Sequence, residues 1–437
     1  MIIAARVPDF DDQTRRRHLR RAVAASTIGT TVEWYDFYLY GAAAALVFPK
    51  LFFSNLDPAL GSLLSYVTFF AGFAARPFGA AIFGHFGDRI GRKALLVTTM
   101  LIMGIATVCV GLVPSYERIG IWGAVVLTVL RALQGIAVGG EWSGSILMAG
   151  EWAAPGRRGL AMSFPQMGSP LGAIMANSAL AIMSTTLDDS AFLEWGWRVP
   201  FLASVVLIVI GLWIRIGTLE SPVFTALKAE RKIVRVPIAE VLRLNWRQVV
   251  LTMLLRTGQL APFYITTTYV LTYGTQVLGL DRADLLNAVS IRAIGSLAVL
   301  PVAGYLADRY GRRRIIGIGA AGTGLWVFAL FALMNTRAMP FVILGLLVDG
   351  MLQDLQYGPQ AAVIAENFPA SRRYTGSGLG YHLAAITAGG PAPAVAAYLF
   401  LVYQSSTAIA LFALATTIVT LATLPWLREN AGTLDRA

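Results

Sequence analysis

Twelve long apolar runs dominate this chain of 437 residues and restrict what it can fold into. A helix needs about 20 consecutive apolar residues to cross the hydrocarbon core of a bilayer. With ends uncertain by about four residues, we expect helices near residues 22–48, 61–86, 94–113, 119–150, 159–184, 197–217, 248–278, 285–307, 314–335, 339–366, 374–402 and 405–427. The prediction is an all-α membrane protein with twelve transmembrane helices.

Composition agrees with this and excludes several classes of function. Only 14% of the residues are charged and 56% are hydrophobic, whereas about 25% of the residues in a soluble domain are charged. The net charge of +11 lies in short clusters between apolar runs, so we expect no nucleic-acid partner. The chain has a single Cys109, no His/Cys metal cluster and no G-x-x-x-x-G-K-[ST] nucleotide loop. We therefore expect no enzyme, no metal and no cofactor.

The distribution of basic residues predicts the orientation. If the twelve runs cross the membrane, 26 of the 35 Lys and Arg residues lie on the side of the N-terminus and five on the other side, with four inside spans. Basic residues collect on the cytoplasmic side of membrane proteins. We expect a multi-pass protein of the inner (cytoplasmic) membrane, with both termini in the cytoplasm.

An internal repeat divides the chain. The segment Gly84-His-Phe-Gly-Asp88-Arg89-Ile-Gly91-Arg92-Lys93 returns 220 residues later as Gly304-Tyr-Leu-Ala-Asp308-Arg309-Tyr-Gly311-Arg312-Arg313. Each copy follows the second helix of a group of six, which predicts two similar six-helix halves. The expected organisation is a cytoplasmic tail at 1–21, a bundle at 22–217, a cytoplasmic linker at 218–247, a second bundle at 248–427 and a tail at 428–437.

The paired G-x-x-x-D-R-x-G-R-[KR] loops make the chain resemble the major facilitator superfamily, whose plan is two halves of six helices. Arg131-Ala-Leu-Gln134-Gly135 is similar to the R-x-x-Q-G signal of that superfamily. The resemblance narrows to the metabolite:proton symporter family at Glu33-Trp-Tyr-Asp36-Phe-Tyr, Arg76-Pro77-Phe-Gly79 and Gly139-Gly140-Glu141-Trp142. It implies uptake, driven by the proton gradient, of organic acids such as citrate, 2-oxoglutarate or shikimate, or of zwitterions such as proline and betaine.

Five ionisable residues inside the first half are candidates for proton coupling. Glu33 and Asp36 are three residues apart and share a face of the first helix, near the middle of the membrane by a rise of about 1.5 Å per residue. Arg76 in the second helix is the expected partner of this pair, and Arg131 and Glu141 form a polar stripe on the fourth helix. A carboxylate there can bind and release a proton, although a static ion pair would also explain the residues.

The second half supplies most of the candidate substrate ligands. Arginine matches a carboxylate with a planar fork, so Arg256 in the seventh helix is the first choice for an anionic group. An internal pair with Asp349 or Asp354 is the alternative. Arg292 is expected in the extracellular third of the eighth helix, as an entry residue or with its head at the interface. The further candidate ligands are Gln259, Tyr264, Tyr269, Gln134 and Tyr40.

The two repeated loops are expected to form a cytoplasmic gate and not a binding site. Asp88 can accept hydrogen bonds from Arg92 or from amides at a helix end, and breaking such contacts would let the halves move apart. The gate residues are Gly84, Asp88, Arg89, Gly91 and Arg92, with their counterparts Asp308, Arg309, Gly311 and Arg312.

The leading hypothesis is a proton-coupled symporter that takes up a small organic anion, in contact with lipid and as a monomer. Uptake of a betaine-like or proline-like zwitterion is the first alternative, because the tyrosines of the seventh helix could surround a quaternary ammonium. Drug or metabolite efflux by antiport is a weaker one, since Gly168-Ser-Pro170-Leu-Gly172 only partly matches the G-P-x-x-G-G antiporter signal.

Overall fold

The computed structural model describes residues 12–90, 92–153, 156–216, 237–369 and 373–429. Within these ranges, helices and their continuations group into twelve long rods. The first six are α1 (Asp12–Leu46), α3 (Pro58–Ile90), α4 (Arg92–Leu112), α6 with α7 (Trp122–Gly139, Trp142–Trp152), α8 with α9 (Arg158–Gln166, Gly168–Thr186) and η1 with α11 (Phe192–Gly196, Arg198–Ile216).

The other six rods follow α13 (Pro237–Leu244), a short helix inside the predicted linker. The seventh rod runs through α14 (Trp246–Tyr264), η2 (Ile265–Tyr269), α15 (Val270–Thr272) and η3 (Tyr273–Val277). The remaining five are α16 (Arg282–Tyr310), α17 (Arg312–Asn335), α18 (Met339–Glu366), α19 with η5 and α20 (Arg373–Ala384, Ala385–Gly389, Ala392–Tyr403) and α21 with η6 (Ser406–Thr423, Leu424–Trp426). The predicted all-α architecture is confirmed.

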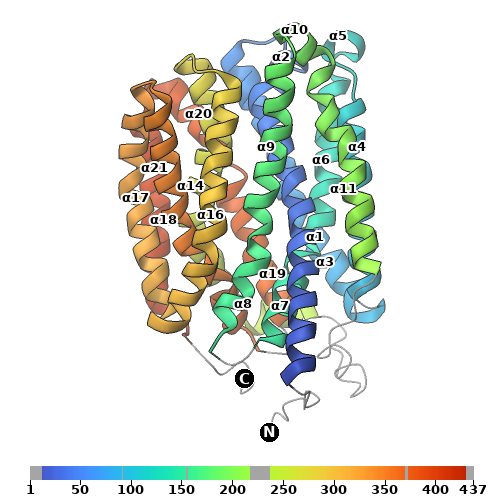
Figure 1. The fold of residues 1–437 in the computed structure, drawn as a ribbon, viewed down its shortest axis with the longest axis vertical. Helices are drawn as coiled ribbons and strands as arrows, with labels where there is room; N and C mark the ends of the chain where they lie inside the picture. Colours follow the sequence, from blue (N-terminus) through green and yellow to red (C-terminus); the bar gives the residue numbers. More distant parts are fainter. Residues whose placement is uncertain (1–11, 91, 154–155, 217–236, 370–372, 430–437) are drawn as a thin grey trace.

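The rods form two groups that lie side by side, the first six in blue and green and the last six in yellow to red (Figure 1). In the first group α3 packs on α6 and α1 packs on α9, whereas in the second α17 and α16 both pack on α18. The groups meet where α16 contacts α8 and α9 and where α3 contacts α19 and α20. A polar residue on one of these contacting faces can therefore interact with residues of the other half.

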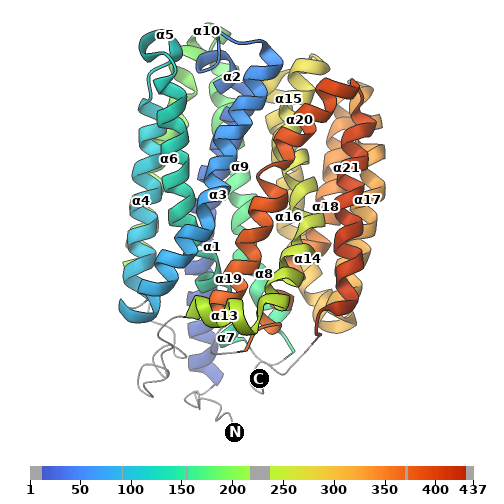
Figure 2. The same cartoon turned by 180° about the vertical axis from the view of Figure 1, so that it is seen from behind.

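The two ends of the bundle differ in charge. Arg157, Arg309, Arg312 and Arg314 lie at one end, called here the basic end, where α13 also crosses the bundle (Figure 2). The short helices α2 (Phe48–Leu51), α5 (Tyr116–Ile119) and α10 (Asp189–Ala191) lie at the other, called here the far end (Figures 1 and 2).

Seven of the described helices are long and apolar enough to cross a membrane, or eight when the bent pair Asp189–Gly196 and Arg198–Trp213 is taken as one span. The α1 and α14 rods fall short of this criterion, and both carry buried ionisable residues, Asp36 and Arg256 among them. Polar side chains at membrane depth are costly and usually functional. The weak apolar signal of these two rods thus coincides with the buried candidate site residues that they carry.

Glycines set the spacing of two rods in the first half, at Gly135 and Gly139. A Cβ on Gly135 would overlap the backbone of Gly72, and one on Gly139 would overlap the carbonyl of Arg76. The α3 and α6 backbones therefore touch directly, which small residues allow in membrane helices. The guanidiniums of Arg76 on α3 and Arg131 on α6 both reach the ring of Phe37 on α1.

Candidate substrate and proton site

Asp36 lies at the centre of a buried polar cluster in the first half. Its Oδ1 accepts a hydrogen bond from Gln134 Nε2 at 2.8 Å and another from the Thr107 hydroxyl, and its Oδ2 lies 3.7 Å from Arg131 Nη1. Arg131 also donates to Gln134 Oε1 at 3.1 Å. These four residues, called the N-terminal cluster, come from α1, α4 and α6 and are all buried. The structure thus brings Asp36, Arg131 and Gln134 together.

Aromatic rings enclose Arg131. Its guanidinium lies over the rings of Phe37 at 4.0 Å, Tyr40 at 4.4 Å and Phe69 at 4.9 Å. Tyr40 donates its hydroxyl to Thr68 Oγ1 at 3.1 Å. Aromatic rings stabilise a cation that has lost its water. Tyr40, a predicted substrate ligand, therefore contacts the arginine of the ion pair instead.

The expected partner of Asp36 was Arg76, but the arginine that pairs with Asp36 is Arg131. Arg76 lies instead over the rings of Phe37 and Phe73, at 4.1 and 4.6 Å. The reason is the register of α3 against α6: Arg76 lies beside Gly139, eight residues after Arg131, whereas Arg131 and its neighbour Gln134 both reach Asp36. Glu33 and Glu141 are also buried, and their proposed part in proton coupling stays a prediction.

Arg256 has a different environment. Its guanidinium stacks on Tyr381 at 3.6 Å, and its Nη1 donates to Gln360 Oε1 at a long 3.4 Å. Among the described residues, neither Arg256 nor Arg76 has a carboxylate within the 4 Å of an ion pair. Both interact electrostatically with buried His382 and with Tyr264. Two buried guanidiniums, one from each half, therefore act on the same region between the halves.

The suggested internal pair of Arg256 with Asp349 or Asp354 is absent among the described residues, because Arg292 occupies that place. Arg292 Nε lies 3.8 Å from Asp349 Oδ2, and Arg292 Nη2 donates to Gln353 Oε1 at 2.8 Å. Arg292 is buried, so the expectation of an entry residue or of a head at the interface was wrong. Its position ten residues into α16, about 15 Å from the start of the helix, was the available signal.

The other predicted substrate ligands of the seventh rod lie in different places. Gln259 is buried on α14, the helix that carries Arg256. Tyr264 ends α14, and its ring lies 5.0 Å from that of Phe73 across the boundary between the halves. Tyr269 lies beyond it in η2, with its ring 6.3 Å from Tyr273. The structure thus places Tyr264 between the halves and Tyr269 away from Arg256.

The second repeated loop joins the two halves at the basic end. Asp308, near the end of α16, accepts hydrogen bonds from the backbone N–H groups of Gly159 and Leu160 at 3.0 and 2.9 Å. These amides begin α8, where a helix attracts negative charge. Arg312 donates to Asp308 at 3.3 Å and also pairs with Glu366. The contact expected for Asp88, with helix-terminal amides, is therefore present at its counterpart Asp308.

The remaining predicted gate residues lie in the second and the first repeated loop. Gly311 turns the chain at a φ of +96°, which glycine adopts without strain. Arg309 is exposed and lies over Tyr310 at 5.4 Å. In the first loop Gly91 lies outside the described residues, and so do the surroundings of Gly84 and the side chains of Asp88, Arg89 and Arg92. Their part in the gate stays a prediction.

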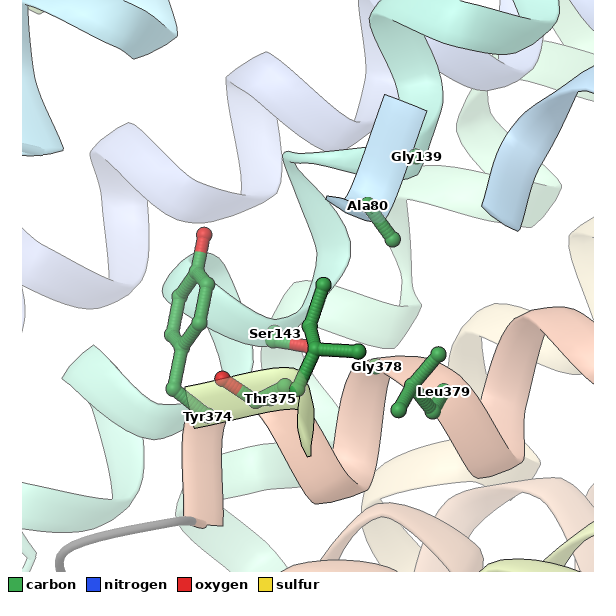
Figure 3. A pocket seen from close by; sticks show the side chains of 8 residues that line it. Ala80, Gly139, Ser143, Tyr374, Thr375, Gly378 and Leu379 are labelled. Carbon is green, nitrogen blue, oxygen red and sulfur yellow. The ribbon is translucent and has the colours of Figure 1, made fainter. Parts of the chain in front are cut away.

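Further contacts link the halves at both ends. Toward the basic end, Trp142 stacks on Tyr381 at 3.7 Å, and the Tyr374 hydroxyl donates to the carbonyl of Gly140 at 2.7 Å. Tyr374 also lines a small pocket with Ala80, Gly139 and Ser143, shown in Figure 3. Toward the far end, three links join the halves: Tyr66 to Thr272 at 2.5 Å, Gln276 to Ser62 at 3.1 Å and Arg282 to Asp189 at 3.1 Å.

Comparison with known proteins agrees with this geometry. The family profile described as Major Facilitator Superfamily matches residues 26–380 and 279–436. The chain belongs to the Major Facilitator Superfamily. It is 42% identical to the Inner membrane metabolite transport protein YhjE of Escherichia coli (strain K12), with 87% of each chain covered. The predicted resemblance to this superfamily is therefore confirmed.

Two further relatives are named by their substrates. The chain is 37% identical to the Shikimate transporter of Escherichia coli (strain K12), over 94% of this chain and 95% of that one. It is 30% identical to the Proline/betaine transporter of the same strain, over 95% of this chain and 84% of that one. This superfamily member is thus a multi-pass membrane transporter of small molecules and not an enzyme.

A solved structure has the same fold. The proton:xylose symporter XylE, bound to 6-bromo-6-deoxy-D-glucose, superposes with a TM-score of 0.74 over 96% of this chain and 98% of that one, at 17% identity. The twelve-helix arrangement of the superfamily is therefore that of this protein.

Proposed function

We propose that this protein is a proton-coupled symporter that takes up a small organic anion by alternating access. The proposal places it in the cytoplasmic membrane as a monomer, with the basic end and both termini in the cytoplasm, as the excess of Lys and Arg at that end favours. The proton gradient supplies the energy, and no cofactor takes part.

One observation carries the anionic substrate. Arg76 and Arg256 are buried, come from different halves and have no carboxylate partner among the described residues. An unpaired buried charge is costly, and a substrate with one or two carboxylates would supply the missing partner. Because the two arginines belong to α3 and α14, such a substrate binds both halves at once. Its binding therefore favours the state in which the halves are closed around it.

The N-terminal cluster is the proposed proton site. Asp36 pairs with Arg131, and both are buried among rings. A proton on Asp36 would remove the charge that holds Arg131, and loss of the proton would restore it. Since the guanidiniums of Arg131 and Arg76 both lie over the ring of Phe37, a change at Asp36 alters the field at the proposed anion site. This links proton binding to substrate binding.

Uptake into proteoliposomes tests the proposal. Labelled shikimate, citrate, 2-oxoglutarate, proline and betaine are supplied under an inward proton gradient, and again after an uncoupler has collapsed it. We expect accumulation of an acid that the uncoupler abolishes. Accumulation that persists with the uncoupler would contradict proton coupling, and an outward flux of all five compounds would contradict uptake.

A zwitterionic substrate is the second candidate, and the aromatic side chains between the halves favour it. Trp34, Tyr38 and Phe263 form a group with ring centroids 5.8 to 6.1 Å apart. Such rings can hold a quaternary ammonium, while an arginine holds the carboxylate of the same molecule. Accumulation of betaine or proline alone in the uptake experiment would select this candidate and reduce Arg76 to a packing role.

A further inference from the structure

The second half contains a buried charge cluster that the anion site and the N-terminal cluster leave unused. Arg292 pairs with Asp349, and Gln353 donates to Asp349 Oδ2 at 2.8 Å and to Thr266 Oγ1 at 3.2 Å. Asp354 also faces Arg292. These residues, called the C-terminal cluster, come from η2, α16 and α18. They lie about 15 to 22 Å from the start of α18, at the middle of the span.

The C-terminal cluster has one carboxylate more than its cations. Asp349 is 0% and Asp354 6% exposed, and Arg292 is the described cation that faces them. Asp349 Oδ1 and Asp354 Oδ2 are buried without a hydrogen-bond partner among the described residues. A second negative charge at this depth would be uncompensated, and an uncompensated charge is strongly unfavourable in the membrane. One carboxylate therefore needs a cation, and a proton is the smallest that fits.

The contacts distinguish the two carboxylates. Asp349 has the ion pair to Arg292 and donors from Gln353 and Thr266, which all favour its charged form. Asp354 has the Ser296 hydroxyl and a more distant Arg292, so its charged form has less support. A protonated Asp354 would also turn an orphaned oxygen into a hydroxyl donor.

We propose that Asp354 is a second proton-binding site, so that a proton carried in the second half adds to the one on Asp36. The inference rests on the proposed proton-coupled function. The charged or titratable groups that face Asp354 in the described residues are Arg292 of α16, Asp349 of α18 and Tyr38 of α1. Tyr38 lies two residues after Asp36 and interacts electrostatically with Asp354. Tyr38 is thus close to Asp36 along α1, interacts with Asp354 and contacts Phe263 of α14, with the ring centroids 6.1 Å apart.

Proton counting tests the inference without transport. The detergent-solubilised protein is titrated between pH 5 and 8 in weak buffer with a pH-sensitive dye, for the wild type, Asp354→Asn and Asp354→Glu. We expect Asp354→Asn to bind about one proton fewer than the wild type, and Asp354→Glu to bind the same number. Equal counts for the wild type and Asp354→Asn would overturn the inference. The matched control is Glu117→Gln, an exposed carboxylate of α5 at the far end, which we expect to bind as many protons as the wild type in this pH range.

Flux measurements make the second test. In proteoliposomes the number of protons taken up per labelled shikimate or citrate is expected to fall by one in Asp354→Asn and to stay unchanged in Glu117→Gln. An unchanged ratio in Asp354→Asn contradicts the inference, as does a wild-type uptake that follows a sodium gradient and loses this dependence in Asp354→Asn. Failure of the wild type to use a proton gradient refutes the proposed function instead, and the titration in detergent still decides about Asp354.

Discussion

The N-terminal and C-terminal clusters are both buried ion pairs at the middle of the bundle, yet they are built differently. In the first half Arg131 of α6 reaches across to Asp36 of α1. In the second half Arg292 of α16 pairs with Asp349 of α18, and a second carboxylate, Asp354, lies beside them. The loop that carries Asp308 repeats between the halves, and both ion pairs use the fourth rod, but α6 supplies the arginine and α18 the carboxylate, and their partners lie on the first rod in one half and on the second rod in the other. The halves therefore share their gate sequence and differ in their inner chemistry.

The largest expected effect is on Asp36. Asp36→Asn keeps the size of the side chain and removes its charge, so proton-driven accumulation should fall at least tenfold while substrate exchange without a gradient continues. Uptake and counterflow in proteoliposomes measure the two. The matched control is Asp284→Asn, an exposed carboxylate on α16. If Asp36→Asn accumulates substrate as well as the wild type does, Asp36 does not bind the transported proton. The N-terminal cluster would then be a structural ion pair only.

The second largest effect is expected on the thermal stability of a variant at Arg131. Arg131→Leu leaves Asp36 as an unpaired buried charge, which costs about 3–5 kcal/mol when one partner of a buried ion pair is removed. We expect a clear fall in the thermal unfolding temperature in detergent, with much of it recovered in the double variant Arg131→Leu with Asp36→Leu. If the double variant is no more stable than the single one, the ion pair is not what holds Arg131.

Arg256 should affect substrate choice more than stability. Arg256→Ala removes the proposed partner of the substrate carboxylate, and a lost charged hydrogen bond of about 1.5–3 kcal/mol corresponds to roughly 10- to 150-fold weaker binding. Competition against labelled substrate measures the affinity for acids and for betaine. Arg247→Ala, exposed at the start of the same helix, is the control. Equal losses for acids and zwitterions would contradict the assignment.

The repeated loop should have a smaller effect. Asp308→Asn keeps one acceptor oxygen for the α8 amides but removes the charge that the helix N-terminus favours, a term of about 0.3–1 kcal/mol. We expect the basic end to open more often, seen as about two- to fivefold faster labelling of a cysteine introduced at Ser143. Arg314→Gln, exposed in the first turn of α17, should leave the labelling rate unchanged. Slower labelling in Asp308→Asn would show that this contact does not close the basic end.

The smallest effect is expected from a carboxylate outside both clusters. Asp188 caps α10 at the far end, and the hydrogen bond from the Ala191 N–H holds its pKa below the ordinary value. Its stabilising effect is present above the pKa of the unfolded chain and is lost as the pH falls through the lower, folded pKa. Asp188→Asn should therefore change the unfolding temperature slightly at pH 7 and not at pH 2. A large effect would mean that loop contacts outweigh the buried clusters.

Much of the candidate site could be recognised from the sequence. An ionisable residue inside an apolar run has to be accounted for, so Asp36, Arg131 and Arg256 stand out without any structure. The ion-pair partners could not be predicted in the same way. Arg76 and Arg131 can both pair with Asp36 when only the positions of residues along the chain are known. Arg292 was misplaced for the same reason, since a run of apolar residues gives depth but not the direction in which a side chain points.

The sequence by itself determined the twelve rods, their grouping into two halves and the repeated loops, because these depend on the length and spacing of apolar runs. Tertiary structure alone decided which charges pair. The contact of α3 with α6 through Gly135 and Gly139 brings Arg131 to Asp36, and the packing of α16 on α18 brings Arg292 to Asp349. Ion pairs extend only a few ångströms, so they depend on how helices are rotated and spaced, which periodicity along one chain does not encode.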